Sequence, residues 1–202
     1  MSAPRRAAPP APRRRGREFV LAAATALFHE RGYDATSMSD LADRLGVTKA
    51  ALYRHVRSKE ELLHAVTAPV RRTVPELLSA STPSHGRPVE TLAALLHRLA
   101  EAAAGDPARH ALFWGTRGGT GQDGPDALCR QAVVRRLTEL LHLAAAQGDV
   151  RADIEPGLAA RLLLGAVIGL GGPADGPGAP PPPSVIGLLL DGPVRVTLAR
   201  AS

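Results

Sequence analysis

The most restrictive feature of the sequence is a series of short amphipathic segments between residues 36 and 63, with only a few residues between one and the next. In the first segment the apolar residues recur at helical spacing: Met38, Leu41, Ala42 and Leu45. Ser37 precedes them and Asp40 follows three residues later, which is the pattern of a capping box. Helices this short are not stable alone, so the segment must fold within a compact helical unit.

The following segment is predicted to be a second short helix, from Lys49 to His55, because Thr48 is suited to cap its start. Only Gly46 and Val47 separate it from the first helix. Two amphipathic helices joined by so tight a turn form a helix-turn-helix unit, here at about residues 37–56.

Two longer helices are predicted to flank this unit. One runs from Arg17 to Arg31 and ends before a glycine. The other runs from Lys59 to about Val74, and Ser58 with Glu61 repeats the capping arrangement at its start. Because proline lacks an amide hydrogen, this last helix is expected to be interrupted at Pro69.

The pattern remains helical to residue 170. Four more helices, each opened by or near a proline, are predicted at 89–104, 107–114, 125–147 and 156–170. No segment shows the alternation of a strand, so the expected fold is all-α. We expect an arm without regular structure at 1–14, a helix-turn-helix domain at 15–74, and a C-terminal helical domain at 75–202 with a Gly/Pro-rich connector at 171–183.

Charge is concentrated at the start of the chain. The net charge is +6, and residues 1–17 hold six arginines and no acid, so the rest is close to neutral. A short basic arm beside a folded unit suits a phosphate backbone or another anionic surface, although it also fits a solvated tail. The single cysteine, Cys129, excludes an internal disulfide and is expected to be an inert, small apolar residue of a helix.

The second helix of the unit has a face suited to the major groove of DNA. The outer face carries hydrogen-bond donors beside small residues that permit close approach: Thr48, Lys49, Ala50, Tyr53, Arg54 and His55. Ser37, Tyr53 and Lys59 lie where donors to phosphates are needed. A structural role, in which Tyr53 and His55 cap a small core, is the alternative.

The combined pattern resembles the tetracycline-repressor (TetR) family of transcription regulators. It covers about a quarter of the chain, in two blocks. The first comprises Ala22, Ala23, Leu27, Phe28, His29, Glu30, Arg31, Gly32, Tyr33, Asp34, Ala35, Thr36 and Ser37. The second is the helix-turn-helix unit and its continuation to about Leu63.

This resemblance implies a homodimeric regulator, usually a repressor, that a small molecule bound in the C-terminal domain releases from a palindromic operator. It implies that Lys49, Ala50 and Arg54 face bases, and that the residues near phosphates are Tyr53, His55, Ser37 and Lys59. In relatives the last two helices form the dimer interface. Here 156–170 fits the first of these, whereas 185–190 would be a short second one.

The resemblance names no effector. Candidate effector-binding residues are those that interrupt the aliphatic C-terminal sequence: His97, His110, Phe113, Trp114, Gln131 and His142. Each of them also suits ordinary packing or an exposed surface.

Other classes of function lack a supporting pattern. No paired acid and base, cofactor motif or closely spaced histidine pair is present, so we predict no enzyme, catalytic residue, cofactor or metal site. A helix-turn-helix protein without a small-molecule sensor remains the alternative, followed by a helical interaction module that has lost DNA binding.

The sequence also bears on where the protein acts. The apolar run 19–28 follows arginines, but Glu18 adjoins it and no cleavage site of small residues follows, so an export signal is not expected. The longest apolar stretch elsewhere, 162–170, is too short to span a membrane. We therefore expect a soluble, cytoplasmic protein without a membrane partner.

Overall fold

The computed structural model describes residues 16–80, 87–115, 124–150 and 152–170. The expected arm at 1–14, the connector at 171–183 and the apolar run at 185–190 lie outside these residues. The helices are α1 (Arg17–Arg31), α2 (Met38–Leu45), α3 (Lys49–Tyr53), α4 (Lys59–Ser79), α5 (Pro88–Gly105), α6 (Pro107–Gly115), α7 (Pro125–Ala146) and α8 (Pro156–Leu170). The described residues contain no strand, which confirms the all-α prediction.

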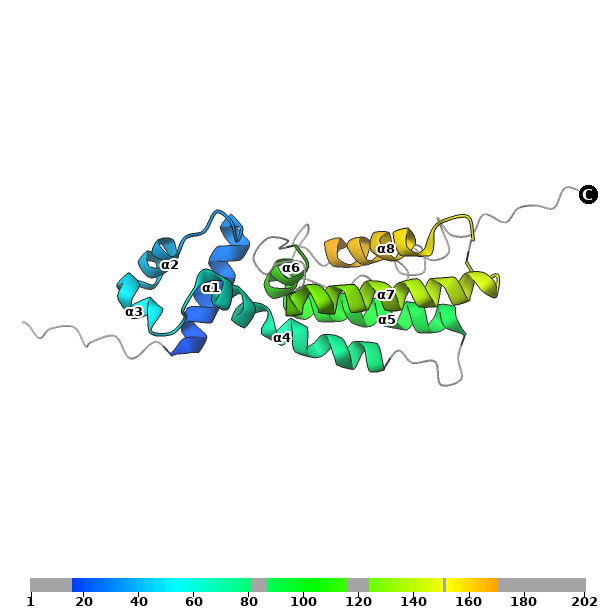
Figure 1. Ribbon diagram of the computed structural model, residues 1–202, viewed down its shortest axis with the longest axis horizontal. Coiled ribbons are helices and arrows are strands. Elements are labelled where there is room, and N and C mark those ends of the chain that lie inside the picture. The colour runs from blue at the N-terminus through cyan, green and yellow to red at the C-terminus, as the bar shows by residue number, and fades with distance from the viewer. Residues whose placement is uncertain (1–15, 81–86, 116–123, 151, 171–202) are drawn as a thin grey trace, which may run out of the picture.

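The molecule is elongated, with two groups of helices along its long axis (Figure 1). At one end α1 packs against the helix-turn-helix unit of α2 and α3, and we call these three helices the head. At the other end α5, α7 and α8 lie side by side and form what we call the body. α4 runs from the head along the body, and α6 lies where the two groups meet.

Each group of helices has its own hydrophobic core. The head core contains Leu27, Phe28, Leu41 and Leu45 with α4 residues Leu62, Leu63 and Val66. The body core contains Leu95, Leu96, Leu137 and Leu140 with α4 residues Val70 and Val74. Because α4 supplies side chains to both cores, its direction relates the head to the body.

The expected interruption of α4 at Pro69 is wrong. α4 continues without a break to Ser79, with both Pro69 and Pro75 inside it. Val70 and Val74 are 3% and 2% exposed, and burial of these residues in the body core outweighs the hydrogen bonds that the prolines remove. The predicted domain boundary at residue 75 therefore falls within a helix.

α6 provides a second connection between head and body, which the sequence did not indicate. Its residues Leu112 and Phe113 are neighbours in the chain, yet Leu112 belongs to the head core and Phe113 to the body core. α6 packs against α1 and α4. None of the helices in the described ranges has the length and apolar character required to traverse a bilayer.

Candidate functional site

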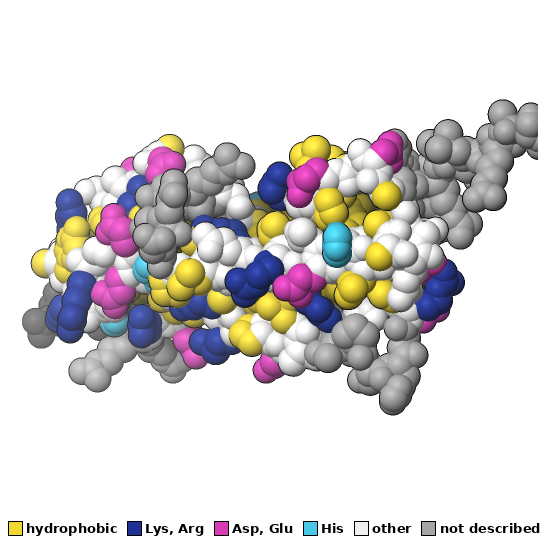
Figure 2. All heavy atoms as spheres, turned by 45° about the vertical axis from the view of Figure 1, so that its right-hand side comes forward, with side chains coloured by type: hydrophobic (Ala, Val, Ile, Leu, Met, Phe, Trp, Pro, Cys, Tyr) yellow, Lys and Arg dark blue, Asp and Glu magenta, His cyan; other side chains and the backbone are white. Residues whose placement is uncertain are grey.

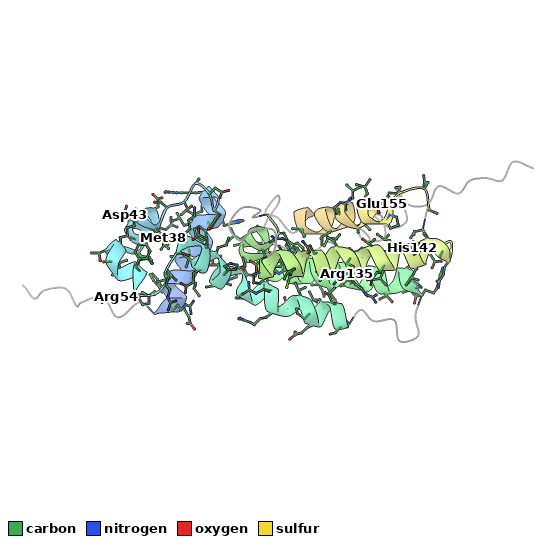
Figure 3. The ribbon with its side chains drawn as sticks, in the orientation of Figure 1. Met38, Asp43, Arg54, Arg135, His142 and Glu155 are labelled. Carbon is green, nitrogen blue, oxygen red and sulfur yellow. The ribbon has the colours of Figure 1, made fainter. Side chains whose placement is uncertain are left out.

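α3 presents most of its surface to solvent. It is anchored by Leu52, which is buried in the head core, while Lys49 and Ala50 are exposed. The helix ends at Tyr53, two residues before the predicted end at His55, and Arg54 and His55 are exposed directly after it. Within the described part of the chain, no hydrogen bond or ion pair engages the side chains of Lys49, Arg54 and His55. These donors are therefore available to an external partner, and Arg54 lies at the outer end of the head (Figure 3).

Tyr53 also faces outward from α3. Its side chain is 43% exposed, so it does not close the small core of the head. This exposure leaves the phenol accessible from solvent, as the predicted phosphate contact requires. His55 is likewise exposed.

Side-chain caps fix the starts of α2 and α3, as predicted. Thr48 Oγ1 accepts a hydrogen bond from the Ala51 amide at 3.1 Å. Ser37 Oγ accepts from the Asp40 amide at 3.1 Å, and the Asp40 carboxylate accepts from the Ser37 amide at 2.7 Å. Ser37 Oγ also donates to that carboxylate at 2.6 Å, and these bonds hold the pKa of Asp40 below its ordinary value. The hydroxyl expected to contact a phosphate is thus already engaged.

Lys59, the other predicted phosphate donor, has partners inside the head. Its Nζ donates to the Asp34 carbonyl oxygen at 3.3 Å and lies 4.2 Å from the centroid of the Tyr33 ring. Burial raises the pKa of Tyr33 to about 12, with smaller contributions from Glu60 and Asp34. Lys59 therefore joins the turn after α1 to the start of α4.

An ion pair that the sequence did not reveal ties α2 to α1. Arg44 Nη1 and Nη2 donate to the two carboxylate oxygens of Glu30 at 3.2 and 3.0 Å. Both side chains are about half exposed, so the contribution of the pair to stability is small, but its two parallel bonds set the relative orientation of the helices. The residues are 14 positions apart, and no local pattern connects them.

The six candidate effector-binding residues do not converge. His110, Phe113 and Trp114 lie together on α6, where the rings of Phe113 and Trp114 meet edge to face at 4.9 Å. On α5, His97 Nε2 lies 3.2 Å from a carboxylate oxygen of Glu101. Gln131 and His142 are exposed on α7, and His142 lies at the end of that helix away from α6 (Figure 3).

The surroundings of α6 contain a polar contact that the sequence did not indicate. Arg130 Nη1 donates to the Phe113 carbonyl oxygen at 2.6 Å, and its guanidinium carbon lies 5.6 Å from the centroid of the Phe113 ring. His110 is buried, and within the described part of the chain its Nδ1 has no hydrogen-bond partner. Burial lowers the pKa of His110, and nearby Asp106 opposes this effect.

A second polar cluster joins α4 to the start of α7. Thr67 Oγ1 donates to Asp126 Oδ2 at 2.7 Å, and Arg71 Nη1 donates to Asp126 Oδ1. Asp126 and Thr67 are 2% and 1% exposed, so this is a buried carboxylate with both oxygens satisfied. Thr67 and Arg71 are one helical turn apart, so their side chains lie on the same face of α4. This spacing alone does not predict that they share a partner on α7.

An open groove of about 700 Å³ lies between the end of α1 and α6. Phe28, His29 and Tyr33 line one side and Ala111 and Leu112 the other. None of the predicted effector-binding residues lines this groove. Across the described ranges, no three His, Cys, Asp or Glu side chains lie close enough together to hold a metal ion.

Comparison with known proteins agrees with the geometry of the head. Residues 20–66 match the family described as "Bacterial regulatory proteins, tetR family". The HTH-type transcriptional activator FasR of Mycolicibacterium smegmatis is 46% identical over 68 residues, which is 34% of this chain and 30% of that protein. The match to the curated relative thus spans less than a third of its length.

Solved structures extend the likeness to most of the chain. SCO3833, a member of the TetR transcriptional regulator family from Streptomyces coelicolor A3, is 31% identical with a TM-score of 0.69, over 85% of this chain and 87% of that one. The chain belongs to the TetR family. AibR in complex with isovaleryl coenzyme A and operator DNA is also similar in structure: it is 25% identical with a TM-score of 0.65, over 86% of this chain and 95% of that one.

Membership of the TetR family assigns a general role to each of the two groups of helices. The head contains the helix-turn-helix of a transcription regulator, and α3 is the second helix of that unit, after α2. The body is the C-terminal helical domain of this TetR-family regulator, and its relatives are regulators rather than enzymes.

Proposed function

We propose that this TetR-family protein is a homodimeric repressor that binds a palindromic operator and is released by a small molecule bound in its body. The observation that carries the proposal is the outer face of α3 and its C-terminal end, where Lys49, Tyr53 and the following Arg54 are exposed and side-chain caps fix the starts of α2 and α3. Such a face can enter a major groove, with Lys49, Ala50 and Arg54 at base edges and Tyr53 and His55 toward phosphates.

The proposed dimer uses α8. One face of this helix is buried in the body core through Ala160, Leu163, Leu164 and Val167. Another face exposes Leu158 and Leu162, and Gly165 and Gly169 have open space around the position of a side chain. Hydrophobic side chains are visible among charged ones over the C-terminal helices (Figure 2). An exposed apolar row ending in glycines suits the close approach of a second copy.

The proposed release requires a path from body to head. α4 and α6 both contribute side chains to the two cores, so a ligand that moves either helix relative to the body would also move the head. The AibR structure contains isovaleryl coenzyme A and operator DNA together, which supports the general scheme of an effector and an operator.

The test is a binding measurement with the DNA that flanks the gene of this protein, against a scrambled duplex at about 150 mM salt. The proposal expects a preference of roughly three orders of magnitude or more and a two-fold symmetric footprint. Equal weak binding to both duplexes contradicts it for that DNA. Thermal shift with a ligand panel that includes isovaleryl coenzyme A then distinguishes a sensor from a helix-turn-helix protein without one, which would show no shift.

A further inference from the structure

We propose that Asp126 connects the parts of α4 on either side of Pro69 and is the positioning residue that holds the head in a fixed orientation to the body. We call the bridge formed by Asp126, Thr67 and Arg71 the splint. Its consequence for DNA binding depends on the proposed function, but the splint itself is tested without DNA. Failure of one is therefore distinguishable from failure of the other.

The three side chains lie at a turn of α4 that Pro69 weakens. Pro69 has no amide hydrogen, so the Ala65 carbonyl lacks its helical hydrogen bond there. This turn also lies between the two cores, because Val66 is the last α4 residue of the head core and Val70 the first of the body core. Bending of α4 at Pro69 would tilt the head between its own core and the body core, and α6 would have to move with it, because Leu112 belongs to the head core and Phe113 to the body core.

The carboxylate of Asp126 bridges this weak turn. Thr67 precedes Pro69 and donates to one oxygen at 2.7 Å, and Arg71 follows Pro69 and donates to the other. The two halves of α4 are thus joined through a group on a different helix. Asp126 lies in the first turn of α7, where the helix dipole favours a negative charge.

The position of α7 is fixed independently of the splint. Val133, Leu137 and Leu140 are completely buried in the body core. Asp126 is therefore a stationary point to which both halves of α4 are attached.

Burial makes the three side chains act as a unit. Asp126 is 2% exposed, so loss of either donor leaves part of a charged carboxylate without a partner and without water. Arg136 and Glu139, by comparison, form an ion pair within α7, and Glu139 is exposed. Both members of that pair lie on α7, so Glu139 provides a control carboxylate on the same helix.

The deciding experiment is amide hydrogen exchange of the full-length protein, followed in peptides that cover residues 64–73 of α4 and residues 92–100 of α5. In Asp126→Asn we expect exchange in 64–73 to be at least about tenfold faster, with exchange in 92–100 unchanged. Glu139→Gln removes the same charge from the same helix and should change neither peptide. Adding Pro69→Ala to Asp126→Asn restores the missing amide and should return 64–73 to within about threefold of the original rate.

Two outcomes would overturn the splint. Unchanged exchange in 64–73 would mean that Asp126 does not hold the turn, and equal acceleration in 92–100 would mean that it contributes only general stability. If Asp126→Asn does not fold, Thr67→Val removes one arm and leaves the ion pair. The same local acceleration, smaller in size, is then expected, and its absence would count against the proposal.

Discussion

At the scale of single residues, what distinguishes the proposed DNA-contacting side chains is whether the protein already uses them. Arg54 and Lys49 have no partner among the described residues, whereas the hydroxyl of Ser37 and the ammonium of Lys59 hold the head together. Substitution of Ser37 or Lys59 would change the head and any phosphate contact at once. Arg54 is the cleaner residue to test.

Arg54→Ala should weaken operator binding by about 1–3 kcal/mol and relax the preference at one base pair, because a base contact carries sequence information. The measurement is a titration of the operator and of single-base variants. Arg135→Ala is the control, since Arg135 is an exposed arginine on α7 in the body (Figure 3). An equal loss in both variants would show that only net charge matters.

His110 gives a prediction about pH. Burial lowers the pKa of its imidazole in the folded protein, so the unfolded chain binds a proton first as the pH falls. The free energy of unfolding should therefore decrease as the pH falls below the ordinary value of 6.5. The loss should stop growing once the pH is below the folded-state pKa.

Urea unfolding at pH 7.5 and pH 5.5 tests this prediction. His110→Gln should lose part of the difference between the two conditions, because glutamine does not titrate. His142→Gln removes an exposed histidine and should retain the difference. If both variants keep the full difference, His110 is not its source.

At the scale of helices, α6 contributes more to the packing of the molecule than its short length suggests. It is short, and two neighbouring residues on it serve different cores. Leu112 is 6% exposed and packs with the head although it lies far along the chain from it.

Leu112→Ala should destabilise the protein by about 2–5 kcal/mol, because it leaves a cavity in the head core. The free energy of unfolding in urea measures this loss. Leu128→Ala is the control, since Leu128 is 57% exposed on α7, and should change the free energy by no more than about 0.5 kcal/mol. Similar small effects in both variants would show that α6 does not stabilise the head.

The sequence predicted local features of the helices well and their mutual packing poorly. Ser37 with Asp40 and Thr48 were identified because a cap is set by residues three positions apart. Ser58 also caps its helix, but the Glu61 carboxylate accepts from the Arg57 amide at 2.8 Å. The continuation of α4 through Pro69 depends on burial against the body, which no local pattern contains.

The same limit explains the site predictions. The exposed residues of α3 follow from one helical face anchored by Leu52. The effector candidates were chosen by residue type, and residue type does not determine which face of α5, α6 or α7 is buried. Asp126 was missed because its two partners belong to another helix, more than 50 residues earlier.

At the scale of the whole molecule, α8 determines the proposed assembly. A dimer is needed if two α3 helices are to meet successive major grooves, roughly 34–36 Å apart. Leu162 is 62% exposed in the middle of α8, on the row that ends in Gly165 and Gly169.

Leu162→Glu should convert the proposed dimer to a monomer, because two buried carboxylates would face one another across a two-fold axis. Sedimentation velocity measures the change. Ala94→Glu introduces the same charge at an exposed position on α5 and should leave the assembly intact. A Leu162→Glu protein that sediments like the parent would place the dimer contact elsewhere.

The division of Leu112 and Phe113 between two cores has a consequence for engineering. A hybrid regulator assembled by cutting the chain within α4 would place this head on the sensing helices of another family member. The head would then lack Leu112, which α6 supplies from well beyond the cut. Successful hybrids of this protein would need the head-facing residue of α6 to be transplanted along with the head.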